Sequence, residues 1–286
     1  MQRIFKQIDV FSKMALKGNP LAVVIDAAGL STDEMQNFAS WTNLSETTFL
    51  TTPTEPTADY AVRIFTPDGE LPFAGHPTLG SCYAWLKAGG VPKGEFIVQQ
   101  CAAGLVKIRQ QNGRLAFAAP PLIKHGPLSD DDLQIIAWGL GILKSDIIAH
   151  NWCDNGPYWR AIKLNSAAEV LALKPNAALL GDFKIGVVGS HSKEKSDIMP
   201  AQNDEPLFEV RAFCCGNGTC VEDPVTGSLN AGLAQWFIGA GMAPDQYIVS
   251  QGTAVGRAGR VFIQKEGANI WVGGHCSEII EGVVYL

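Results

Sequence analysis

The sequence predicts an α/β (α+β) protein of two similar lobes, and three observations support this fold class. Segment 222–237 repeats segment 70–85 at an offset of 152 residues. Patterns typical of strands and of helices alternate in both halves of the chain. At 286 residues the chain is near the size at which a second hydrophobic core becomes usual. Two copies of so long a unit indicate two lobes, because solenoid repeats are short and stacked.

The repeat rests on residues that match in the same order. The matched pairs are Glu70 and Glu222, Pro72 and Pro224, Gly75 and Gly227, and Gly80 and Gly232. After a shift of four residues, the upstream pairs are Arg63 and Arg211, and Phe65 and Phe213. Each match is weak alone, because Gly and Pro are common. Their shared order favours an ancient duplication of a half-chain unit, in which His76 falls opposite Ser228.

In the first half, a helix near 31–42 begins with a capping box of Ser31 and Glu34 and carries an apolar stripe. A second helix starts at Gly75 and His76 and is apolar on nearly every side, so we expect it to be buried. Alternating and β-branched runs between turn residues predict strands at 4–11, 21–25, 47–51, 63–66, 96–101, 105–109 and 115–118.

The second half begins with a capped helix at 129–138. Two short helical patterns follow Ala167 and Asn176, and a polar loop spans 190–205. The repeated motif predicts a helix that starts at Gly227. Further strands are expected within 147–164 and at 184–188, 207–213, 248–251, 260–264, 269–272 and 278–284.

The boundary between the lobes is expected between about 120 and 128, after Pro120 and Pro121. The first lobe would then span 1–122, with the C-terminal strand able to cross back to it, and the second lobe would span 123–286.

Composition excludes several classes of protein. The apolar fraction of 47% and the charged fraction of 17% are typical of a globular protein with an ample core. A net charge of −6 argues against nucleic-acid binding by bulk electrostatics. No apolar run approaches 18 residues and no leader follows Met1, so we expect no membrane partner. Seven cysteines without framework spacing fit a reducing compartment, and a cytoplasmic location is expected.

The two repeated helix starts, Gly75-His76 and Gly227-Ser228, are the expected binding site. A helix start offers free N–H groups and the positive end of the helix dipole, which favour an anion such as a carboxylate. If the lobes are related by a pseudo-two-fold axis, both starts would face one cleft.

Near these helix starts we expect Asp223 and Glu46 to carry the chemistry. A carboxylate partly removed from water is suited to take a proton from carbon and return it near neutral pH. His76 would donate to a developing oxyanion from its neutral form, or act as a second acid. Taken singly, each residue has a structural alternative. His76 would contact a backbone carbonyl, Asp223 would stabilise a helix dipole, and Glu46 would lie exposed at a strand end.

These residues carry a family resemblance. The strings FTPDGELPFAGHPTLG and EDPVTGS, with GNPLAVV and NLSETTF, resemble the phenazine-biosynthesis PhzF-like family, over essentially the whole chain. The resemblance implies a diaminopimelate epimerase-type fold. Such a fold has two pseudo-symmetric lobes, each a curved, mostly antiparallel sheet wrapped round a central helix. It also implies a single site in the cleft and a homodimer.

The resemblance further implies an isomerase that needs no cofactor or metal and acts on a small carboxylic-acid substrate in a biosynthetic process. In such an enzyme a glutamate shuttles a proton between carbons of a small unsaturated acid. Carried over by motif, Glu46 would be the base and acid, and His76 and Asp223 would assist. Ser228 and the N–H groups of Gly75 and Gly227 would hold the substrate carboxylate.

Three alternatives remain open. A cysteine-dependent epimerase or racemase needs two thiols, and the first lobe's central motif offers only Cys82, so we interpret Cys214 and Cys215 as incidental thiols in a turn. A zinc site that includes Cys220 lacks the usual C-x₂-C pairing. A non-catalytic protein that binds a small carboxylate would keep the same donors. Titratable groups without an evident counter-charge favour the enzyme.

Overall fold

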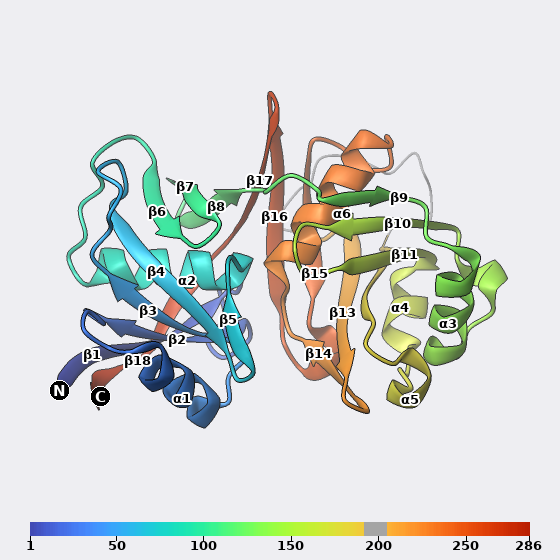
Figure 1. Ribbon diagram of the computed structural model, residues 1–286. Coiled ribbons are helices and arrows are strands. Elements are labelled where there is room, and N and C mark those ends of the chain that lie inside the picture. The colour runs from blue at the N-terminus through green and yellow to red at the C-terminus, as the bar shows by residue number, and fades with distance from the viewer. Residues whose placement is uncertain (192–204) are drawn as a thin grey trace. The chain divides into compact units, whose positions relative to one another are not determined.

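The computed structural model describes residues 1–191 and 205–286. The chain splits into two compact units (Figure 1). Unit 1 comprises Met1–Ala118 and Gly273–Leu286, and unit 2 comprises Ala119–Val272. Most of the polar loop predicted at 190–205 lies outside the described residues.

Unit 1 is a mostly antiparallel sheet with one helix against each face. The strands are β1 (Gln2–Val10), β2 (Asn19–Ile25), β3 (Thr47–Thr51), β4 (Tyr60–Thr66), β5 (Gly69–Leu71), β6 (Ile97–Cys101), β7 (Gly104–Gln111), β8 (Arg114–Ala118) and β18 (Cys276–Tyr285). Strand β1 is antiparallel to both β2 and β18, so the C-terminal strand belongs to the sheet of the N-terminal unit. The pairs β2–β3 and β4–β6 are parallel.

The two helices of unit 1 differ in what they cover. Helix α1 (Thr32–Thr42) has the predicted capping box of Ser31 and Glu34, and packs with Phe49 and Phe65 in one apolar cluster. Helix α2 (Gly75–Lys87) contacts strands β1, β2, β3, β4, β6, β8 and β18, so the sheet curves round it. The apolar character of α2 on nearly every side is explained by this burial.

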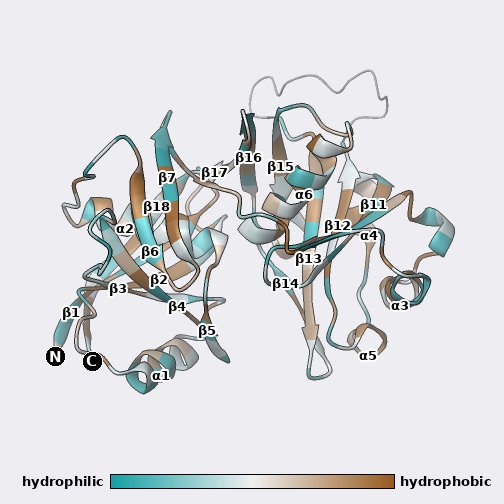
Figure 2. Cartoon of the chain, turned by 45° about the horizontal axis from the view of Figure 1, so that its top comes forward, coloured by the Kyte–Doolittle hydropathy of each residue, from teal (hydrophilic) through white to brown (hydrophobic). Residues whose placement is uncertain are grey.

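Unit 2 repeats this plan. Its strands are β9 (Lys124–Gly126), β10 (Ala149–Asp154), β11 (Trp159–Ser166), β12 (Lys184–Ser190), β13 (Phe208–Gly216), β14 (Thr219–Asp223), β15 (Gln246–Gln251), β16 (Gly259–Glu266) and β17 (Asn269–Gly274). Its helices are α3 (Asp130–Leu140), α4 (Ala167–Ala172), α5 (Ala177–Leu180) and α6 (Gly227–Gly239), with 3₁₀ turns at Lys144–Asp146 and Thr253–Val255. An apolar cluster that includes Ile136, Ile162, Val187 and Phe213 contains residues of α3 and β11–β13. Helices α4 and α5 contact strand β13 on this side (Figure 2).

The order of strand pairings supports the duplication that the sequence indicates. The parallel pairs β11–β12 and β13–β15 in unit 2 correspond to the parallel pairs β2–β3 and β4–β6 in unit 1. A hairpin precedes each central helix, β4–β5 before α2 and β13–β14 before α6. The predicted fold class is therefore confirmed: a sheet-dominated α+β chain with a buried central helix in each unit.

The matched glycines Gly80 and Gly232 let a strand approach the central helix closely. A Cβ atom at Gly80 would lie 2.5 Å from Leu21 Cδ2, at the end of a flexible side chain. A Cβ atom at Gly232 would lie 2.6 Å from the backbone oxygen of Cys153. Since glycine has no Cβ, neither clash occurs. Close packing of the strand against the helix therefore explains why both copies of the repeat have glycine at this position.

Three short strands were not predicted from the sequence. Strands β5, β9 and β14 are only three to five residues long and carry Gly, charged or polar residues. So short a strand shows no clear hydrophobic period. None of the described helices combines the length and the apolar character needed to cross a lipid bilayer.

Candidate active site

Glu46 and His76 meet in unit 1. Glu46 lies between the end of α1 and the start of β3, and His76 is the second residue of α2. Oε2 of Glu46 is 3.5 Å from Nδ1 of His76, and the two side chains are 16% and 3% exposed. The structure thus brings together two of the residues that the sequence singled out, beside the start of a buried helix.

His76 is held neutral by its surroundings. Burial lowers its pKa to about 3, so the imidazole carries no charge at physiological pH. Asn19 Nδ2 lies 3.4 Å from the same Nδ1 atom. A neutral imidazole can donate one hydrogen bond and accept another, so it can support a neighbouring carboxylate without forming a salt bridge.

The central helices start differently from the other described α-helices. Side chains of Ser31, Ser129, Ser166 and Asn176 cap helices α1, α3, α4 and α5. Ala74 before α2 and Thr226 before α6 make no such bond. Backbone N–H groups in the first turn of a helix have no partner within that helix. At Gly75 and Gly227 these groups therefore remain suited to an anion.

Asp223 lies at the end of β14 in unit 2 and accepts a hydrogen bond from Thr226. Thr226 Oγ1 donates to Asp223 Oδ2 at 2.5 Å. Gln251 Nε2 in turn donates to Thr226 Oγ1 at 2.9 Å and to the Asp223 carbonyl at 3.1 Å. Because Gln251 uses up an acceptor position on the Thr226 hydroxyl, the hydroxyl proton is directed to the carboxylate of Asp223.

Gln251 is a further residue of this network that the sequence analysis missed. It is fully buried, and its Oε1 atom accepts from Thr226 N at 3.1 Å and from Asn230 Nδ2 at 2.8 Å. In unit 1 Gln99, also fully buried, donates to Thr78 Oγ1 at 3.0 Å. Gln99 and Gln251 are separated by the same 152 residues as the two helices. That offset was the signal that could have found them.

Ser228, opposite His76 in the repeat, is held by the turn between β10 and β11. Trp159 Nε1 donates to Ser228 Oγ at 3.0 Å, and Asn155 Nδ2 donates to the Ser228 carbonyl at 2.8 Å. Ser228 follows Gly227 in the first turn of α6. Its hydroxyl therefore lies at the helix start, where an anion is favoured.

The matched arginines and glutamates form the same ion pair in each unit. Arg63 binds Glu70 through Nε at 2.7 Å and Nη2 at 2.6 Å. Arg211 binds Glu222 in the same bidentate way at 3.1 and 2.6 Å. In both units the guanidinium group also lies over the matched phenylalanine ring. These residues tie each hairpin to its sheet.

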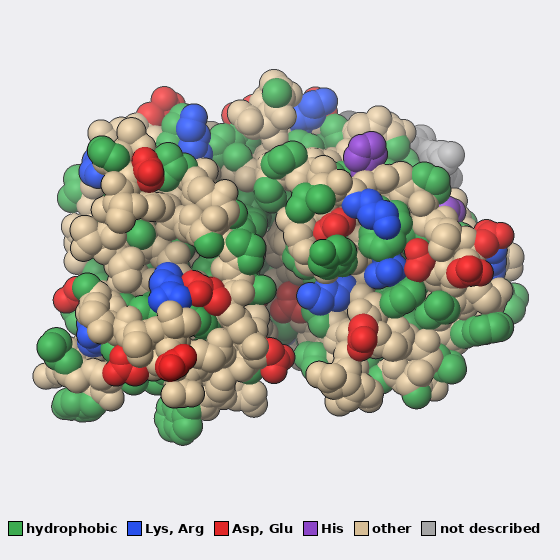
Figure 3. Space-filling model, viewed as in Figure 1, with side chains coloured by type: hydrophobic (Ala, Val, Ile, Leu, Met, Phe, Trp, Pro, Cys, Tyr) green, Lys and Arg blue, Asp and Glu red, His purple; other side chains and the backbone are tan. Residues whose placement is uncertain are grey.

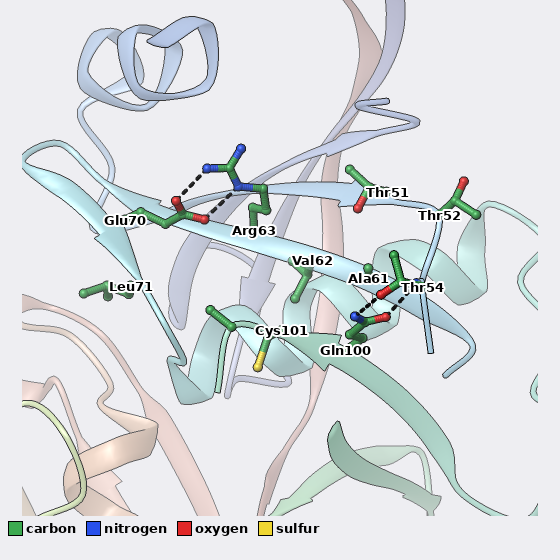
Figure 4. Close-up of a pocket in the computed structure, with 11 residues that line it drawn as sticks. Thr51, Thr52, Thr54, Ala61, Val62, Arg63, Glu70, Leu71, Gln100 and Cys101 are labelled. Atoms are coloured by element: carbon green, nitrogen blue, oxygen red, sulfur yellow. Dashed lines mark hydrogen bonds and ion pairs between the residues drawn. The ribbon is translucent and has the colours of Figure 1, made fainter. Parts of the chain in front are cut away.

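A hollow of about 310 Å³ lies beside the first of these pairs in unit 1 (Figure 4). It is lined by Arg63, Glu70, Gln100 and Cys101, among others. Its polar groups bond to one another, Arg63 to Glu70 and Gln100 to Thr54. None of the candidate site residues lines it.

The cysteine motif differs from its predicted state. Cys215 forms a disulfide with Cys220, which lies directly opposite it in the β13–β14 hairpin with a Cα–Cα distance of 4.0 Å. The interpretation of Cys215 as an incidental thiol was therefore wrong. Asn217 and Gly218 have φ angles of 51° and 74°, as an Asn-Gly hairpin turn requires. This turn brings Cys215 and Cys220 together, which their spacing alone did not indicate.

Comparison with known proteins identifies the family. The family model described as phenazine biosynthesis-like protein matches residues 8–282. The chain belongs to the phenazine biosynthesis-like family. Antisense-enhancing sequence 1 of Schizosaccharomyces pombe is 35% identical over 306 residues, covering 99% of this chain and 98% of that protein.

Other members of the phenazine biosynthesis-like family are named isomerases. An uncharacterized isomerase of Pasteurella multocida is 34% identical, covering 93% of this chain and 89% of that one. The trans-2,3-dihydro-3-hydroxyanthranilate isomerase of Pseudomonas aeruginosa is 31% identical, covering 98% of both chains. The chain is accordingly an isomerase of this family.

Solved structures support the fold. A phenazine biosynthesis protein of the PhzF family from Bacillus anthracis covers 100% of both chains at 21% identity and a TM-score of 0.80. A hydroxyproline epimerase from Agrobacterium vitis covers 99% of this chain and 92% of its own, at 11% identity and a TM-score of 0.57. The epimerase shares the fold with this family.

Proposed function

We propose that this protein is a cofactor-independent isomerase that moves a proton between two carbons of a small unsaturated or cyclic amino or hydroxy carboxylic acid. The observation that carries the proposal is the contact between Glu46 and a neutral, buried His76 at the uncapped start of α2. Relatives named for trans-2,3-dihydro-3-hydroxyanthranilate, an acid of this class, support the choice of substrate.

Glu46 is the proposed proton carrier. Its carboxylate takes a proton from an allylic carbon of the substrate, and the electron pair of the broken C–H bond moves into the adjoining π system. The double bond shifts by one carbon, and the protonated Glu46 returns the proton to the carbon at the other end. The proton count is unchanged and no oxidant or reductant is required. A single carboxyl group suffices because it acts first as base and then as acid.

His76 and the backbone donors have supporting roles in this proposal. Neutral His76 keeps Glu46 in place and can stabilise its protonated or ionised form by a hydrogen bond. In unit 1, the N–H groups at Gly75 bind negative charge that develops as the proton leaves. In unit 2, Asp223 positions the substrate, and Gly227 and Ser228 bind its carboxylate.

The cysteine-dependent racemase is the less favoured alternative. A two-base thiol mechanism requires two cysteine sulfurs, one as a thiolate that removes the proton and the other as a thiol that supplies one. Cys215 is bound to Cys220, and burial raises the pKa of Cys82 to about 12. Neither sulfur offers a thiolate near neutral pH. A non-catalytic carboxylate-binding protein is excluded if turnover is measured.

The experiment that tests the proposal is proton NMR in D₂O. The wild-type protein, dialysed against a chelator, is incubated with trans-2,3-dihydro-3-hydroxyanthranilate and with other small cyclic unsaturated acids. The proposal predicts that one substrate is isomerised without added metal or cofactor and gains deuterium at the carbon that is protonated. Turnover that disappears on chelation and returns with a metal would contradict it.

We further propose that the protein is a homodimer, as the family resemblance implies, and that it is cytoplasmic, as the composition indicates. Light scattering coupled to size-exclusion chromatography tests the assembly, and a monomer mass at working concentration would overturn it. On the face shown in Figure 3, acidic and basic side chains are interspersed, and the net charge is −6. This charge pattern supports a small-molecule substrate over a nucleic-acid partner.

A further inference from the structure

The turn between β10 and β11 is built to hold the start of α6. Asp154 is 3% exposed, and its Oδ1 atom accepts hydrogen bonds from Gly156 N and Tyr158 N, both at 2.8 Å. This fixed turn presents Asn155 to the carbonyl of Ser228 and Trp159 to its hydroxyl. Trp159 is itself only 2% exposed, so its indole ring is locked by packing.

The contact between Trp159 and Ser228 determines what the hydroxyl can do. An indole N–H only donates, whereas a serine hydroxyl has one proton to donate and two acceptor positions. Since Trp159 Nε1 donates to Ser228 Oγ at 3.0 Å, the hydroxyl proton must point to a different atom. Within the described part of the chain, the hydrogen bonds of Ser228 Oγ include no acceptor for that proton. The hydroxyl is left as a donor to a bound ligand.

The same arrangement recurs in unit 1. Asn19 is the first residue of β2, as Trp159 is of β11, and its Nδ2 atom lies 3.4 Å from Nδ1 of His76. Asp9 is 2% exposed, and its Oδ2 atom accepts from the backbone N–H groups of Lys17 and Gly18, both at 3.0 Å. In each unit, a polar side chain at the start of a strand therefore contacts the second residue of the central helix: Asn19 contacts His76, and Trp159 contacts Ser228. Because the contact recurs with different side chains, we interpret it as a shared positioning role.

We propose that Trp159 is a positioning residue, which fixes the hydroxyl of Ser228 as a donor to the carboxylate of the bound acid. This inference rests on the proposed function, which assigns Ser228 to the substrate carboxylate. Trp159 does not touch the substrate in this scheme and acts through Ser228. Without the indole N–H, the hydroxyl can rotate and offer its lone pairs to the anion, which repels them.

The test compares two probes that differ in charge and hydrogen-bonding capacity. Anthranilate carries a carboxylate, which only accepts, whereas anthranilamide carries a neutral group that both donates and accepts. Isothermal titration calorimetry measures the affinity of each probe for the wild-type protein and for Trp159→Phe. We expect Trp159→Phe to weaken the binding of anthranilate about five- to tenfold, which corresponds to the loss of one ordinary hydrogen bond. The affinity for anthranilamide should change less than twofold, so the effects on the two probes should differ roughly threefold or more.

Trp152→Phe is the matched control. Trp152 lies on the neighbouring strand β10, is 7% exposed and packs in the same unit. We expect this variant to lose thermal stability as Trp159→Phe does, but to bind anthranilate like the wild type. Equal weakening of both probes by Trp159→Phe would indicate a merely structural role and overturn the inference.

A double-mutant cycle with Ser228→Ala separates this inference from the proposed function. If Trp159 acts through Ser228, Trp159→Phe has little further effect on anthranilate in the Ser228→Ala background. Additive losses would overturn the role of Trp159 while leaving Ser228 as the carboxylate ligand. Unchanged binding in Ser228→Ala alone would overturn both assignments.

Discussion

Glu46 Oε2 lies 3.5 Å from His76 Nδ1, and burial keeps this histidine uncharged. The relationship is therefore a carboxyl group beside a neutral imidazole rather than an ion pair. His76 therefore places no fixed positive charge beside the carboxyl group of Glu46. A neutral neighbour suits the proposed role of Glu46, which takes a proton and then returns it.

The buried histidine predicts how stability depends on pH. His76 binds a proton at about pH 6.5 when unfolded and only at about pH 3 when folded. The unfolded state therefore binds more protons between these values, and the free energy of unfolding falls as pH drops from 6.5 toward 3. The slope due to this group is at most about 1.4 kcal/mol per pH unit. Urea denaturation of the wild type and of His76→Gln at pH 7.5, 6 and 5 measures this slope. If the free energy of unfolding has the same pH dependence in both proteins, the prediction is contradicted.

Thr226 is predicted to act through Asp223. Thr226→Val removes the hydroxyl that donates to Asp223 Oδ2. We expect kcat to fall about ten- to a hundredfold, since a hydrogen bond to a carboxylate is worth about 1.5–3 kcal/mol and each 1.4 kcal/mol is about a factor of ten. Thr226→Ser should restore turnover.

The matched control for Thr226 is Thr78→Val in unit 1. The Thr78 hydroxyl donates to the Ala74 carbonyl and accepts from Gln99, and contacts no candidate catalytic side chain. We expect it to lose stability by about 1–3 kcal/mol with little change in kcat. If Thr226→Val and Thr78→Val lose kcat equally, the loss would reflect general destabilisation and not an action of Thr226 through Asp223.

The two repeat glycines are predicted to differ in their tolerance of alanine. Gly232→Ala drives a methyl group against the backbone oxygen of Cys153, whereas Gly80→Ala meets the end of the Leu21 side chain, which can move. We expect a cost of about 1–3 kcal/mol at Gly80 and a larger one at Gly232. Urea midpoints of the two variants provide the comparison. A Gly232→Ala protein as stable as Gly80→Ala would contradict the packing account.

The disulfide is predicted to be dispensable for turnover. Cys215→Ala breaks the bond to Cys220 without touching Glu46, His76 or Asp223. We expect turnover to stay within about twofold and stability to fall by about 2 kcal/mol, as for a short closed loop. Steady-state rates and thermal unfolding of the variant measure both. A hundredfold loss of turnover would return the thiol-dependent epimerase to consideration.

Local signals in the sequence predicted much of the fold. The cap of Ser31, the start of α2 at Gly75 and the repeated helix at Gly227 lie where the sequence placed them, because caps and helix periods act over a few residues. The sequence also singled out Glu46 and His76, which the structure brings within contact distance. Short strands such as β14 gave no usable period.

What the sequence missed depends on contacts made only after folding. Trp159 and Gln251 are joined to α6 by hydrogen bonds between segments far apart in the chain, and each side chain alone resembles an ordinary core residue. The Cys215–Cys220 bond depends on the strand register set by the Asn-Gly turn. Gln251 could have been found from the sequence, because Gln99 lies at the repeat offset from it. Trp159 could not, because its counterpart in unit 1, Asn19, is a different type of residue.

Solvent exchange in Glu46→Gln tests the central claim most directly. The wild type and the variant are incubated in D₂O with the substrate that the wild type isomerises, and deuterium in the substrate and product is followed by NMR. Because glutamine has nearly the shape of glutamate but cannot carry the proton, we predict no deuterium uptake while calorimetric binding stays within about threefold, or about 0.7 kcal/mol. Undiminished deuterium uptake by Glu46→Gln would remove Glu46 from the mechanism.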